Sequence, residues 1–86
     1  MKISVELTLM PLQDNFEAPI SKFIKKLRES KFTVLENPMS TQIYGDYDEL
    51  MPYLTKEIKA SLHQQENAVL NLKIVTSDRS NYEPHF

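Results

Sequence analysis

The side chains best suited to chemistry in this chain are polar groups two residues apart, a spacing that places them on one face of a β-strand. Ser4, Glu6 and Thr8 alternate with apolar residues, a pattern typical of a half-buried strand. The other positions predicted to share that face are Met10, Gln42, Tyr44, Asn71, Lys73 and Val75. Such a set of hydroxyls, amides, a carboxylate and an aromatic ring suits either a polar ligand or a seam between two copies of the chain.

Glu6 and Lys73 are expected to lie on neighbouring antiparallel strands, close enough to pair. An ion pair on a solvated face contributes little to stability, so one interpretation of this face is ordinary surface. The other is a ligand platform or the interface of a closed, two-fold homodimer.

Residue types that serve catalysis or metal binding are sparse. The chain has no cysteine, which excludes a thiolate nucleophile, a thiolate metal site and a disulfide. His63 is expected to be exposed, and His85 has no partner at metal-ligand spacing. Asp46, Asp48 and Glu49 precede a predicted helix, where the helix dipole already favours acidic groups. We therefore predict no catalytic residue, no metal site and no cofactor.

Size and charge set further bounds. The 86 residues suffice for one domain with a thin core, which association with a second copy would stabilise. A net charge of −2 without a basic stripe argues against nucleic-acid partners and anionic membrane surfaces. No apolar run approaches the length of a membrane span, and Glu6 interrupts the apolar core that a secretory signal needs. We expect a cytoplasmic protein.

The hydrophobic periodicity predicts six elements. Strands are expected at 3–10, 32–36, 41–44 and 68–76, with amphipathic helices between the first and second and between the third and fourth. This βαββαβ order predicts a ferredoxin-like α+β sandwich, with an antiparallel sheet of order 4-1-3-2 and both helices on one face. The domain is expected to span residues 1–79, and residues 80–86 to form an irregular tail that includes His85.

Four residues around the second helix carry specific expectations. Gly45 is the only glycine. We expect it to end the third strand, and either to adopt a positive φ or to let another group approach the backbone closely. Pro52 would kink a helix interior, so we place the helix start at Asp48, which leaves Pro52 in the first turn. Glu66 and Asn67 are expected to close this helix.

Four short motifs then resemble one family. They are Met10-Pro11, Pro38-Met39-Ser40-Thr41, Tyr44-Gly45-Asp46 and Ser77-Asp78-Arg79. Together with the first strand, which runs into Met10-Pro11, they resemble the small thiamine-binding proteins related to YkoF, and the likeness covers about residues 2–79. The resemblance implies a cytoplasmic, non-enzymatic binder of thiamine or its hydroxymethylpyrimidine moiety, assembled as dimers or tetramers through the open sheet face or strand edges. Ser40 and Tyr44 depart from the family, which usually has Gly and Glu there.

For such a ligand we predict that Glu6 and Thr8 bind its polar edge, while Tyr44 and Met39 flank its ring. The complete predicted ligand-binding set is Glu6, Thr8, Asn37, Met39, Thr41, Gln42 and Tyr44. Two other functional classes remain as alternatives. One is an assembly or regulatory domain with a different ligand or none. The other is an enzyme, although an acylphosphatase-like activity would need an Arg in a phosphate-binding loop where this chain has residues 13–15, Gln-Asp-Asn.

Overall fold

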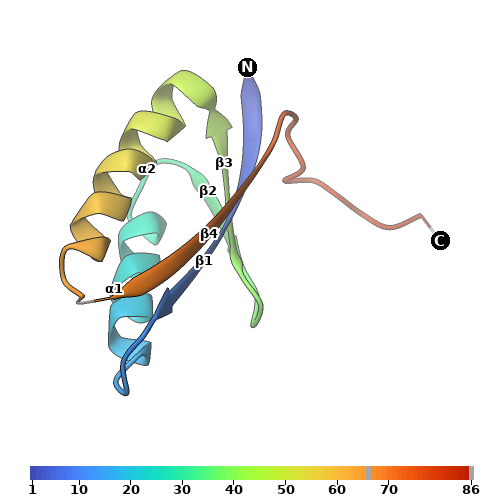
Figure 1. The fold of residues 1–86 in the computed structure, drawn as a ribbon. Coiled ribbons are helices and arrows are strands. Elements are labelled where there is room, and N and C mark those ends of the chain that lie inside the picture. Colours follow the sequence, from blue (N-terminus) through green and yellow to red (C-terminus); the bar gives the residue numbers. More distant parts are fainter. Residues whose placement is uncertain (66, 86) are drawn as a thin grey trace.

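A four-stranded antiparallel sheet with two helices on one side makes up this computed structural model, which describes residues 1–65 and 67–85 (Figure 1). The elements are β1 (Lys2–Pro11), α1 (Glu17–Arg28), β2 (Thr33–Glu36), β3 (Thr41–Asp46), α2 (Tyr47–Leu62) and β4 (Ala68–Val75). The sheet order is β2-β3-β1-β4. The predicted ferredoxin-like βαββαβ fold and its 4-1-3-2 order are confirmed.

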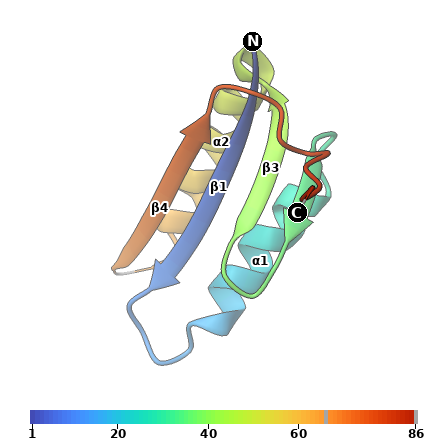
Figure 2. The same ribbon diagram turned by 90° about the vertical axis from the view of Figure 1, so that its right-hand side faces the viewer.

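The alternation in β1 decides which side of the sheet is covered. Its residues Ile3, Val5, Leu7 and Leu9 are buried against the helices. The helices bring their own apolar stripes to the same core: Phe23 and Leu27 from α1, Leu50 and Leu54 from α2. In Figure 2 both helices lie behind the sheet, so the viewer faces the side that no helix covers.

The strand register fixes the uncovered side, which we call the open face. Glu6 lies opposite Gln42 on β3 and opposite Lys73 on β4, and residues that are directly opposite in antiparallel strands share a face. The Lys73 Nζ lies 3.5 Å from the Glu6 Oε1. The predicted Glu6–Lys73 pair is therefore confirmed.

Gly45 serves close packing rather than an unusual backbone conformation. Its φ is not positive, and β3 continues through it to Asp46, so the expectation that it ends the strand is wrong. A Cβ at this position would lie 2.7 Å from Cδ1 of the Phe32 ring. That ring also packs against Tyr53, with 5.5 Å between ring centroids. Gly45 thus leaves the space that Phe32 fills.

The second helix differs from the prediction at both ends. It begins at Tyr47 and ends at Leu62, so Pro52 lies beyond the first turn and the expected start at Asp48 is wrong. Asp46 caps the helix, accepting a hydrogen bond from the Asp48 backbone N–H at 3.1 Å. The expectation that Glu66 and Asn67 close the helix is also wrong, because the helix ends at Leu62. Glu66 itself lies outside the described residues.

The Asp46 cap predicts an acid-sensitive contribution to stability. The hydrogen bond from the Asp48 N–H lowers the pKa of the Asp46 carboxyl below its usual value of 3.8. A carboxylate with a depressed pKa stabilises the fold above its unfolded-state pKa, and that stabilisation is lost as the pH falls through the folded-state value.

Asp46→Asn retains a capping oxygen but cannot titrate. We expect its free energy of unfolding, measured with urea, to fall less steeply than that of the wild type as the pH is lowered from about 4. Equal slopes for the two proteins would contradict this role.

None of the helices in the described part of the chain is both long enough and apolar enough to span a membrane.

Candidate ligand-binding site

A chain of polar contacts crosses the middle of the open face, centred on Glu6. The Ser40 hydroxyl donates to the Glu6 Oε2 at 3.0 Å, and the Gln42 side-chain amide donates to the Ser40 oxygen at 2.6 Å. Lys73 approaches the other carboxylate oxygen from β4. We call Glu6, Ser40, Gln42 and Lys73 the polar cluster; Lys73 and Ser40 contact the Glu6 carboxylate directly, and Gln42 is linked to it through Ser40.

Glu6 remains available to a ligand despite these contacts. Its side chain is 42% exposed, and an ionised carboxylate offers about four lone-pair sites. Ser40 and Lys73 occupy two of them. The remaining capacity can accept hydrogen bonds from a donor-rich or cationic ligand, and such charge-assisted bonds are stronger than neutral ones.

The segment after β4, from Ser77 to Arg79, borders the open face near Ser4, at the start of β1. The buried Ser4 hydroxyl donates to the Ser77 carbonyl at 2.7 Å and accepts from the Arg79 N–H at 2.8 Å. Figure 2 shows this segment passing in front of β3, and Figure 1 shows the chain beyond it leading away from the sheet. Burial raises the pKa of the Tyr44 phenol, and the charges of Asp78 and Glu6 add to that shift. Tyr44 is therefore a neutral ring and hydrogen-bonding group beside the polar cluster.

A recess adjoins the polar cluster where β3 stops beside β1. The β1–β3 pairing runs only as far as Leu7 and Thr41, whereas β1 continues to Pro11. The resulting recess of about 150 Å³ is walled by Ile20 and Ile24 of α1 and by the β2–β3 loop. Leu7, Leu9 and Phe23 place most of this lining on the helix side of the sheet. Thr8 and Ser40 also line the recess, and Ser40 is the one residue that it shares with the polar cluster.

The β2–β3 loop is held in shape by its own asparagine. The Asn37 side-chain oxygen accepts from the backbone N–H groups of Met39 and Ser40, at 2.8 and 2.9 Å. This arrangement is an Asx turn, in which the side chain replaces a backbone acceptor. It leaves the Met39 side chain 82% exposed at the mouth of the recess.

The seven residues predicted for the site fall into two groups. Glu6, Gln42 and Tyr44 come together on the open face. Thr8, Asn37, Met39 and Thr41 line the recess. Thr41 is nevertheless only 6% exposed, and as the register partner of Leu7 it points toward the helices. The structure therefore separates Thr41 from the polar cluster.

Ser40 is the residue that the ligand prediction left out. It links Glu6 to Gln42 and also lines the recess. The signal was present, because Ser40, Gln42 and Tyr44 continue one period-two series. Lys73 was predicted as the partner of Glu6 but not as a site residue.

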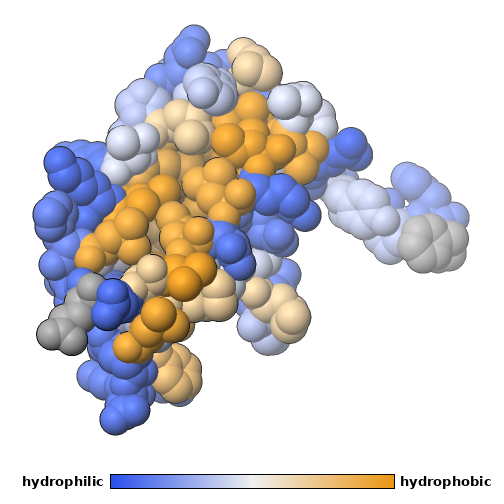
Figure 3. Space-filling model, viewed as in Figure 1, coloured by the Kyte–Doolittle hydropathy of each residue, from blue (hydrophilic) through white to orange (hydrophobic). Residues whose placement is uncertain are grey.

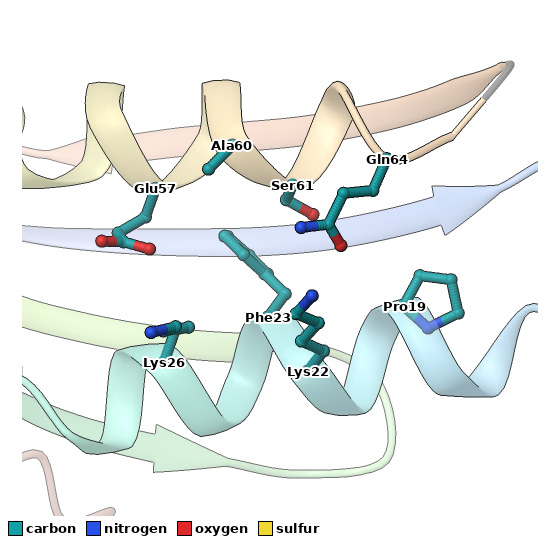
Figure 4. A pocket seen from close by; sticks show the side chains of 8 residues that line it. All are labelled: Pro19, Lys22, Phe23, Lys26, Glu57, Ala60, Ser61 and Gln64. Atoms are coloured by element: carbon teal, nitrogen blue, oxygen red, sulfur yellow. The ribbon is translucent and has the colours of Figure 1, made fainter.

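Two hollows elsewhere are wider but are lined by none of the predicted site residues: one of about 420 Å³ along α1 and one of about 520 Å³ between α2 and β4. A hollow between α1 and α2, flanked by Lys22, Lys26 and Glu57, encloses only about 50 Å³ (Figure 4). Small-molecule pockets usually measure roughly 300–1,000 Å³. Within residues 1–65 and 67–85, no three His, Asp, Glu or Cys side chains lie close enough together to hold a metal ion.

Solved structures support the same architecture. Protein SP2199 from Streptococcus pneumoniae is 28% identical, with a TM-score of 0.83, covering 94% of this chain and 92% of its own. TM0486 from Thermotoga maritima, a proposed thiamine biosynthesis/salvage protein, is 19% identical, with a TM-score of 0.80 over 90% of this chain and 85% of its own. Hypothetical protein MJ1052 from Methanocaldococcus jannascii is 25% identical, with a TM-score of 0.73, covering 95% of this chain and 84% of its own.

Sequence comparison gives the family directly. No curated protein matches the chain. The model of one family, described as thiamine-binding protein, matches residues 5–85. That match includes the polar cluster, the recess and the segment after β4. The chain therefore belongs to the thiamine-binding protein family.

Proposed function

We propose that this protein is a non-enzymatic, cytoplasmic binder of thiamine or its hydroxymethylpyrimidine moiety, and that it works as a homo-oligomer. The observation that carries the proposal is the exposed Glu6 carboxylate beside a partly apolar recess, in a chain that belongs to a thiamine-binding family. Binding requires no chemical step, so the proposal needs neither a nucleophile nor a metal ion.

The chemistry of the ligand matches the two parts of the site. An aminopyrimidine presents donors and acceptors along one edge, and a thiazolium ring is a cation. Glu6 can accept the amino group and attract the cation, while Thr8 supplies a second polar contact. The aromatic face of Tyr44 suits a cation or a flat ring, and Met39 supplies an adaptable apolar contact.

The volume of the recess determines how much of the ligand it can hold. The recess of about 150 Å³ is smaller than the pockets that enclose drug-sized ligands, which measure roughly 300–1,000 Å³. We therefore place one ring of thiamine in the recess and the remainder across the polar cluster. A ligand that consists of a single pyrimidine ring would lose the second part of this contact.

A thermal-shift panel tests the proposal. A ligand that binds only the folded state raises the melting temperature with its concentration. We expect thiamine and hydroxymethylpyrimidine to do so. We expect little effect from cytidine, whose aminopyrimidine ring carries an oxo group and a ribose in place of the methyl and hydroxymethyl groups, and from choline, which is a cation without a ring. An absence of any shift with thiamine at millimolar concentration would reject the proposed ligand and favour a pure assembly domain.

A further inference from the structure

Lys73 is the one charged residue of β4, and the strand register sets it beside the centre of the candidate site. Figure 3 shows apolar side chains gathered over β4 and the neighbouring part of α2. Leu72 and Ile74, which flank Lys73 in the chain, are apolar and partly exposed. Successive side chains of a strand point to opposite faces, and the register partner of Lys73 is Glu6. The sheet backbone itself therefore places the ammonium group on the open face.

The contact between Lys73 and Glu6 is loose. Among the described residues, Glu6 is the one carboxylate that forms an ion pair with Lys73. The Lys73 Nζ lies 3.5 Å from the Glu6 Oε1, farther than the about 2.7–2.9 Å that is typical of a charge-assisted hydrogen bond. The Lys73 side chain is also 68% exposed. Exposed ion pairs of this kind contribute little to stability, so a ligand can displace the ammonium group at little cost.

The two oxygens of the Glu6 carboxylate are held differently. Oε2 accepts a hydrogen bond from the Ser40 hydroxyl at 3.0 Å. Ser40 is itself fixed by the Gln42 side-chain amide and by the Asx turn at Asn37, so this oxygen has a short, neutral donor in a defined position. Oε1 is approached by the long, exposed side chain of Lys73. A donor group of a ligand would therefore replace Lys73 at Oε1 and leave the Ser40 contact intact.

The charge of Lys73 distinguishes two kinds of ligand. A neutral amino group can donate to Oε1 while the ammonium group stays nearby, because it adds no second positive charge. A cation at the same position meets the positive charge of Lys73 as well as the negative charge of Glu6. Like charges a few ångströms apart repel measurably even at the dielectric constant of water, and more strongly near a protein surface. Lys73 therefore reduces the attraction of Glu6 for a ligand cation.

We propose that Lys73 is a specificity-determining residue, which competes with a cationic ligand for the Glu6 carboxylate and favours a neutral aminopyrimidine there. This inference rests on the proposed function and assigns the two ends of thiamine within it. The amino group of the pyrimidine contacts Glu6, and the thiazolium ring lies on the side of Glu6 away from Lys73. Tyr44 suits that position, because it belongs to β3, and β3 and β4 flank β1 on opposite sides.

The substitution Lys73→Met tests the competition, since it keeps an unbranched side chain and removes the charge. Calorimetric titrations give the dissociation constants for thiamine and for hydroxymethylpyrimidine. We expect the ratio of the first to the second to fall about 3- to 10-fold in Lys73→Met. The fall should shrink as the salt concentration rises from about 0.05 to about 0.5 M, because salt screens exposed charges. Lys73→Arg keeps the charge and should not lower the ratio below that of the wild type.

Lys25→Met is the matched control, because Lys25 is an exposed lysine of α1, on the other side of the sheet. It removes the same charge from the chain and should leave the ratio as in the wild type. An unchanged ratio in Lys73→Met, or an equal fall in Lys25→Met, would overturn this inference while thiamine binding stands. A wild type that binds neither ligand would instead reject the proposed function, and this inference with it, so the two failures are distinguishable.

Discussion

Replacement of Glu6 by glutamine is expected to weaken thiamine binding about 10- to 100-fold without unfolding the protein. Hydrogen bonds to charged groups contribute roughly 1.5–3 kcal/mol, and each 1.4 kcal/mol corresponds to about a tenfold change in affinity. Glutamine keeps the shape of the side chain and can still accept from Ser40, but it loses the charge that attracts a cation. Isothermal titration calorimetry measures the difference.

The matched control is Glu29→Gln, which removes an exposed carboxylate at the end of α1, outside the polar cluster and the recess. This variant should bind thiamine as the wild type does. Equal affinities for wild type and Glu6→Gln would remove Glu6 from the site, whereas equal losses in both variants would indicate a general effect of charge rather than direct contact.

Gly45→Ala is expected to destabilise the protein by about 1–3 kcal/mol, the usual cost of overpacking a core. The added methyl group would lie 2.7 Å from a Phe32 ring carbon and 3.6 Å from Leu50 Cβ. The Phe32 ring has little room to move, because it packs on Tyr53 and against the buried core. Urea denaturation with a constant m-value measures this loss.

A double-mutant cycle identifies the cause of that loss. If the methyl group clashes with Phe32, Gly45→Ala should cost markedly less in a Phe32→Leu background, because the smaller side chain removes the obstacle. Coupling of this kind between contacting residues is commonly about 0.5–3 kcal/mol. Strict additivity of the two substitutions would mean that the cost arises from the backbone and not from the ring.

Most of the fold follows from local patterns in the sequence. The alternation from Ile3 to Leu9 identifies a central strand with one buried side, and the stripe from Ile20 to Leu27 identifies a helix that packs on it. Once the order βαββαβ is set, right-handed crossovers leave few sheet topologies. The Glu6–Lys73 pair follows from that topology, since it needs only the strand order and an approximate register.

The features that were not predicted depend on contacts between distant segments. The role of Gly45 depends on Phe32, a neighbour in space but not in the adjoining sequence. The segment after β4 is fixed by Ser4, more than 70 residues away along the chain. Thr41 was included for its hydroxyl group, although its alternation with Gln42 places it among the helix-facing residues. The exposure of Leu72 and Ile74 arises because the helices leave part of the β4 edge uncovered.

The central claim is that a thiamine-type ligand binds at the polar cluster and the adjoining recess. A titration of the ¹⁵N-labelled protein with thiamine, followed by amide chemical shifts, tests it most directly. The account predicts saturable shifts concentrated at Glu6, Thr8, Ser40, Gln42 and Tyr44, with little change along the outer surfaces of α1 and α2. Saturable shifts confined to the helices, or none at millimolar thiamine, would contradict it.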